Sequence, residues 1–116
     1  MLRLVALLLI LAGSASAAEL TFDIRIEGGR VHDTMQLIRV HEGDTVKLRW
    51  TSDRPLTLHL HGYDIEKRVD PNVTTELNFT AYATGRFPIE IHGSGSGAGG
   101  GAHQGSPMAV IEVYPR

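Results

Sequence analysis

Cysteine is missing from the 116-residue sequence. Its absence excludes disulfide bonds, thiolate metal ligands and thiol catalysis. The sequence also lacks an excess of positive charge, because 11 Lys and Arg residues face 13 Asp and Glu residues. We find neither a basic patch typical of nucleic-acid binding nor a long basic amphipathic helix typical of membrane-surface binding. A nucleophile elbow, a phosphate-binding loop and an evident acid–base pair are missing too, so we do not expect an enzyme.

Long hydrophobic runs are also scarce, and the one that stands out lies at the amino terminus. Arg3 precedes an unbroken apolar run from Leu4 to Ala12, and Ala15-Ser16-Ala17 follows. This order is typical of a cleaved signal peptide. The run is too short for a transmembrane helix, which needs about 20 apolar residues, although an uncleaved anchor is the alternative. We therefore expect a signal peptide over residues 1–17, one domain over residues 18–116, and a periplasmic or secreted protein without a membrane segment after cleavage.

The rest of the chain alternates between apolar and polar residues in short runs. A period of two indicates β-strands with one buried face, and no segment shows helical periodicity over three turns. Seven or eight such strands, separated by Gly, Pro, Asn and Asp, predict an all-β Greek-key sandwich or barrel. We expect strands at 20–27, 35–41, 46–50, 56–60, 65–69, 75–79, 85–92 and 107–114, and one possible helical turn near Tyr82.

Histidines are the side chains here that carry chemistry, and all six follow the predicted signal peptide. His59 and His61 alternate with Leu58 and Leu60, so both imidazoles should leave the same face of one strand. The alternative is a pair of solvated or hydrogen-bonded histidines on a polar face. Gly62 follows them and permits a bend at the strand end.

A second histidine segment lies near the carboxyl terminus. Glu90 and His92 share one face of a predicted strand, and a glycine-rich run of ten residues then leads to His103 and Met108. Taken alone, the glycine run is a tolerated insertion and Met108 is a core residue. We interpret the two histidines near turns, His32 and His41, as solvated surface residues.

The order of these segments resembles the cupredoxin family. Its members take one histidine from a mid-chain strand and further ligands from around the loop before the last strand. By this resemblance His61 or His59 matches the first ligand, His92 falls at the position of the cysteine ligand, and His103 and Met108 follow in the order of the later ligands. The stretch Leu58–Gly62 is also similar to the His-x-His-Gly segment of multicopper oxidases.

Without cysteine, the resemblance cannot extend to a blue-copper site, which depends on a copper–thiolate bond. Imidazole nitrogen suits copper, and copper binds a given nitrogen site most tightly among the divalent metals, although zinc is chemically possible. Glu90 is either a further ligand or a group that orients a ligating imidazole. His59 either ligates beside His61 or hydrogen-bonds to a neighbour such as Glu90.

We therefore expect an exported copper-binding protein used in copper handling, delivery or tolerance. The resemblance implies copper as the cofactor, and as a further partner a periplasmic protein that receives copper or exchanges electrons. Two alternatives remain open at this point: an electron-transfer or oxidase-associated domain, and a metal-free structural or partner-binding sandwich. The metal hypothesis requires that the imidazoles near residues 60 and 92 meet in space.

Overall fold

Short strands make up nearly all of the regular structure. The computed structural model describes residues 16–93 and 107–116, and in these ranges it contains nine strands, one short 3-10 helix and no α-helix. The elements are β1 Glu19–Glu27, β2 Arg30–Val31, η1 Asp33–Met35, β3 Leu37–His41, β4 Thr45–Ser52, β5 Leu56–Leu60, β6 Ile65–Val69, β7 Thr75–Thr80, β8 Gly85–Gly93 and β9 Ala109–Tyr114.

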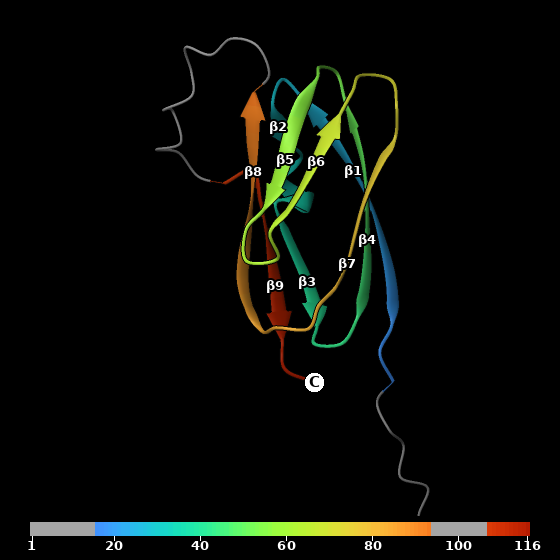
Figure 1. Ribbon diagram of the computed structural model, residues 1–116, viewed down its shortest axis with the longest axis vertical. Coiled ribbons are helices and arrows are strands. Elements are labelled where there is room, and N and C mark those ends of the chain that lie inside the picture. Colours follow the sequence, from blue (N-terminus) through green and yellow to red (C-terminus); the bar gives the residue numbers. More distant parts are fainter. Residues whose placement is uncertain (1–15, 94–106) are drawn as a thin grey trace, which may run out of the picture.

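The strands form two mixed sheets that pack as a sandwich (Figure 1). One sheet has the order β2-β1-β4-β7 and the other β3-β9-β8-β5-β6. In each sheet one pair is parallel, β1 with β4 and β3 with β9, and the remaining pairs are antiparallel. The chain passes repeatedly from one sheet to the other, as between β3, β4 and β5. The predicted all-β sandwich is confirmed.

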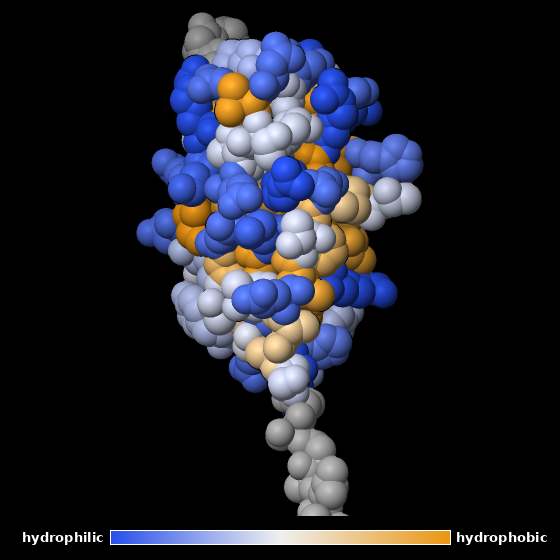
Figure 2. All heavy atoms as spheres, turned by 90° about the vertical axis from the view of Figure 1, so that its right-hand side faces the viewer, coloured by the Kyte–Doolittle hydropathy of each residue, from blue (hydrophilic) through white to orange (hydrophobic). Residues whose placement is uncertain are grey.

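The core lies between the sheets because each strand alternates buried and exposed residues. Leu48 and Trp50 of β4 are fully buried, as are Leu58 and Leu60 of β5 in the opposite sheet. These residues face each other across the sandwich, and apolar burial of this kind is the main stabilising contribution to folding. Outward-facing positions are mostly polar. Figure 2 views the molecule from the right-hand side of Figure 1, and there hydrophobic atoms form small groups between hydrophilic side chains.

Four details of the strand prediction were wrong. The strand expected from residue 35 begins at Leu37, because His32 caps a 3-10 turn by accepting the N–H of Thr34. The two-residue strand β2 was too short to produce a periodic pattern. The last strand begins at Ala109 rather than at residue 107, where proline has no N–H to donate. The connection around Tyr82 forms no helical turn.

Two sequence predictions, the signal peptide and the ligand His103, concern residues that the structure does not describe. Residues 1–15, which hold nearly all of the predicted signal peptide, and residues 94–106, which hold His103, lie outside the described residues. Within the described part, no helix is long and apolar enough to cross a membrane.

Candidate functional site

The histidine pair of β5 lies on the outer face of the five-stranded sheet. Leu58 and Leu60 turn inward and are fully buried, so the alternation of the strand sends His59 and His61 to the other side. The neighbouring strand β8 runs antiparallel to β5, with Glu90 opposite His59 and His92 opposite Thr57. The two histidine segments, about thirty residues apart in sequence, therefore share one surface.

The three imidazoles form a continuous group on this surface. The ring centres of His59 and His61 are 4.1 Å apart, and those of His59 and His92 are 5.8 Å apart. The prediction that imidazoles near residues 60 and 92 meet in space is confirmed. We call the group of His59, His61, Glu90 and His92 the histidine cluster.

Each ring of the β5 pair has a carboxylate nearby. His61 Nε2 lies 3.0 Å from Glu90 Oε2, and His59 Nε2 lies 3.7 Å from Asp64 Oδ1. The Asp64 side chain is 99% exposed, so water weakens its attraction for His59. Glu90 is only one-third exposed and its contact with His61 is the closer of the two. The charge nearest to the rings therefore comes from Glu90.

The Nε2 atom of His61 is buried but has no aligned hydrogen-bond partner among the described residues. It is close enough to Glu90 for an ion pair, but the angle does not suit a hydrogen bond. Buried polar atoms are nearly always hydrogen-bonded, so an exception calls for an explanation such as a bound ion. An ion reaches this nitrogen only after a neighbouring side chain turns aside, because the atom has no exposed surface.

A tight turn fixes the position of His61. The residues that follow it, Gly62 and Asp64, both have positive φ angles, of 86° and 58°. A Cβ atom on Gly62 would lie 2.4 Å from Cδ1 of Phe87, so only glycine lets the backbone approach that ring. Tyr63 packs its ring against Phe87, with ring centres 4.7 Å apart, and its hydroxyl donates to the carbonyl of Ala83 at 3.0 Å.

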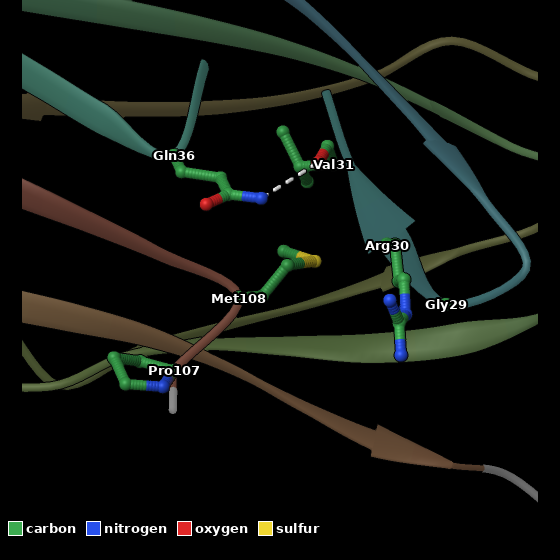
Figure 3. A pocket seen from close by; sticks show the side chains of 6 residues that line it. All are labelled: Gly29, Arg30, Val31, Gln36, Pro107 and Met108. Atoms are coloured by element: carbon green, nitrogen blue, oxygen red, sulfur yellow. Dashed lines mark hydrogen bonds between the residues drawn. The ribbon is translucent and has the colours of Figure 1, made fainter. Parts of the chain in front are cut away.

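Met108, a further predicted ligand, does not join the histidine cluster, and His103 lies outside the described residues. Met108 is partly buried against the core and lines a pocket of about 450 Å³ with residues of β2 and of the segment before β3. Figure 3 shows its side chain pointing between Gln36 and Arg30. Its role as a ligand, like that of His103, stays a prediction. His32 and His41 are exposed, as expected.

The donor atoms of the cluster suit copper, but they do not form a finished site. With metal–ligand bonds of about 2 Å, two donors on one ion lie about 3 Å apart, and two such imidazole rings have centres roughly 4.5–6 Å apart. The 3.0 Å between His61 Nε2 and Glu90 Oε2 and the 5.8 Å between the ring centres of His59 and His92 agree with this, whereas the 4.1 Å between the ring centres of His59 and His61 is shorter. Within the described part of the chain, however, no three carboxylates or imidazoles are placed to hold one ion together.

Two features of the cluster were not anticipated from the sequence. The carboxylate near His59 is Asp64 rather than Glu90, and Glu90 instead approaches His61. The signal for Asp64 was its place two residues after Gly62 in the turn, which folds back toward the strand. No sequence pattern could indicate the diagonal contact of Glu90 with His61, because this contact depends on the register of β5 against β8.

Comparisons with known proteins support the fold and no narrower grouping. No protein-family model matches the sequence, and no curated protein matches it. Solved structures do resemble it. A heme-copper terminal oxidase has a TM-score of 0.61 and 16% identity, and the match covers 80% of this chain and 63% of that one.

Two further structures match more of this chain. A multi-copper oxidase from Pseudomonas thermotolerans has a TM-score of 0.62 and 20% identity over 87% of this chain and 31% of its own. A copper nitrite reductase from Nitrosomonas europaea has a TM-score of 0.60 and 19% identity over 84% of this chain and 42% of its own. The chain thus spans less than two thirds of each of these longer chains, and its fold is cupredoxin-like.

Proposed function

We propose that this is an exported copper-binding protein that handles, delivers or buffers copper through a histidine site without a thiolate. The single observation that carries the proposal is the meeting of His59, His61 and His92 on one sheet face, with Glu90 beside His61. Imidazole and carboxylate donors without sulfur favour Cu(II), and copper exceeds the other divalent metals in affinity for nitrogen ligands.

The cupredoxin-like fold supports copper over zinc, because the similar structures include a multi-copper oxidase and a copper nitrite reductase. The amino-terminal sequence supports export, since Arg3, the apolar run and Ala15-Ser16-Ala17 follow the order of a signal peptide. The cluster lies on the outer face of the sheet and its side chains are partly exposed, which suits an ion that is taken up and passed on. His103 is the proposed source of a further imidazole ligand.

Equilibrium dialysis of the chain from Ala18 against Cu(II), with a weak chelator as competitor, tests the proposal. We expect about one copper retained per chain, and electron paramagnetic resonance that reports nitrogen ligation. A triple variant, His59→Ala, His61→Ala and His92→Ala, should lose this copper. The matched control, His32→Ala with His41→Ala, removes two exposed imidazoles elsewhere and should retain it. Equal retention by both variants, or none by the unaltered chain, contradicts the proposal.

The second candidate is an electron-transfer or oxidase-associated domain, which the similarity to a heme-copper terminal oxidase favours. It predicts a reversible redox couple for the copper-loaded chain in voltammetry. The position of Met108 argues against it, because this thioether lies in a pocket with Gln36 and Arg30. The handling role therefore ranks first.

A further inference from the structure

A buried carboxylate, Asp44, joins both ends of the described chain. Its side chain is 2% exposed and lies in the turn between β3 and β4. Its Oδ1 accepts the backbone N–H of Ala18 at 3.0 Å, and its Oδ2 accepts the backbone N–H of His41 at 2.9 Å. The guanidinium of Arg116 pairs with the same Oδ1 atom.

Ala18 is held in place on both of its backbone polar groups. Its N–H donates to Asp44, and its carbonyl accepts the N–H of Thr45 at 2.9 Å. The pairing of β1 with β4 begins at the next residue, Glu19, opposite Thr45. Ser16 and Ala17 are exposed, and the guanidinium of Arg116 donates to the Ser16 carbonyl at 3.1 Å. Within the described residues, the backbone hydrogen bonds that tie β1 to β4 thus start at Ala18.

We propose that Asp44 binds the new amino terminus of the protein, which is the α-amino group of Ala18 once the signal peptide is removed after Ala17. Hydrolysis of the Ala17–Ala18 amide by a signal peptidase consumes one water, leaves a carboxylate on Ala17 and frees the α-amino group of Ala18. That nitrogen already lies 3.0 Å from Asp44 Oδ1. Cleavage converts a neutral N–H donor into an ammonium donor at the same position, so a hydrogen bond to the carboxylate gains the attraction of an ion pair.

The charges around the Ala18 nitrogen determine whether cleavage stabilises or destabilises the fold. Asp44 is the anion that contacts this nitrogen, and Arg116 is a cation on the same carboxylate oxygen. The charge of the His41 ring, at the end of β3, favours the ionised form of Asp44. Burial limits the access of water to Asp44, so its attraction for the ammonium is screened less than at the surface. The inference rests on the predicted cleavage and is independent of copper binding.

The test compares two purified chains that differ at one end, residues 18–116 and residues 16–116. Both contain every described strand. At pH 6 we expect the chain from Ala18 to have a roughly tenfold smaller unfolding constant, which matches a rise of about one unit in its α-amino pKa. A raised pKa stabilises the fold below the unfolded value of about 8, and the advantage is lost as pH rises through the folded value. The difference should therefore vanish by pH 10.

Two further measurements distinguish a failure of the interaction with Asp44 from a failure of the predicted cleavage site. Asp44→Asn in both chains should abolish the difference, and if that variant does not fold, an NMR titration of the labelled Ala18 amino group replaces it. Equal stability of the two chains at pH 6, a difference that persists at pH 10, or an unshifted amino group overturns the proposal. The intact mass of the exported protein checks the cleavage itself. A mature chain that starts elsewhere than Ala18 overturns the physiological role and leaves the copper proposal untouched.

Discussion

Glu90 of β8 places its carboxylate 3.0 Å from Nε2 of His61, although the strand register sets it directly opposite His59. The contact is therefore diagonal across two strands, and diagonal neighbours on one sheet face are within reach of long side chains. On the same face, the ring centres of His59 and His92 are 5.8 Å apart. Glu90 thus brings its carboxylate to the histidine cluster through His61 rather than through His59.

Replacing Glu90 by glutamine should weaken copper binding about tenfold, because groups that orient or charge-balance a ligating imidazole typically affect metal affinity by about 10–100-fold. Glutamine keeps the size of the side chain and removes its charge. The measurement is a Cu(II) dissociation constant by chelator competition at constant pH. The matched control is Glu66→Gln, which removes an exposed carboxylate opposite His59 on the other neighbouring strand, β6. An equal loss in both variants points to a general effect of surface charge and contradicts a specific role.

Single removal of His59 or His92 should lower copper affinity about 100-fold, at least as much as loss of an orienting group. In the proposed site the two rings supply nitrogen donors from different strands, so neither can replace the other. Binding should also weaken on acidification, since imidazole must be neutral to ligate. His41→Ala serves as the control, because His41 lies on the same sheet but its ring contacts Tyr114. Unchanged affinity in His59→Ala and His92→Ala removes these rings from the site.

The sequence predicted the elements of this fold far better than their contacts. Strands such as Leu56–Leu60 were found within a residue because burial on one face produces a visible alternation. The neighbourhood of His59 and His92 was predicted through the resemblance and the shared strand faces. The partners of the carboxylates were not, because side-chain pairing depends on register, and a shift of one residue reverses every side chain of a strand. The position of Met108 required knowledge of β2, which two residues are too few to reveal.

Gly62→Ala should destabilise the fold by about 2–4 kcal/mol, because it combines a strained positive φ with a steric clash. The added Cβ would lie 2.4 Å from Phe87, whose ring is held by Tyr63. Urea unfolding at neutral pH measures the change. Gly28→Ala is a matched control, since Gly28 also has a positive φ, 60°, but open space around it. It should cost only about 1 kcal/mol. An equal decrease in the free energy of unfolding of the two variants would show that the close approach to Phe87 contributes nothing to the cost of Gly62→Ala.

Tyr63→Phe should cost about 1 kcal/mol at pH 7 and progressively less above pH 10. The hydroxyl donates to the Ala83 carbonyl and accepts the Ala83 N–H, and a net hydrogen bond contributes about 1 kcal/mol. Burial raises the pKa of the Tyr63 phenol above its ordinary value of 10.0, against an opposing effect of the Ala83 N–H.

The sign of the pH dependence follows from that direction. A raised folded pKa means that the native state keeps its proton where the unfolded chain has lost it. Stability is therefore lost as pH rises past the unfolded value, and the variant, which has no phenol at residue 63, lacks this loss. Urea unfolding of both proteins between pH 7 and pH 11 measures the convergence. Tyr82→Phe is the control, because this ring also packs on Tyr63 but is 67% exposed, and its removal should change stability by less than about 0.5 kcal/mol. Parallel pH profiles for Tyr63→Phe and the unaltered protein would mean that the phenol ionises equally well in the folded chain.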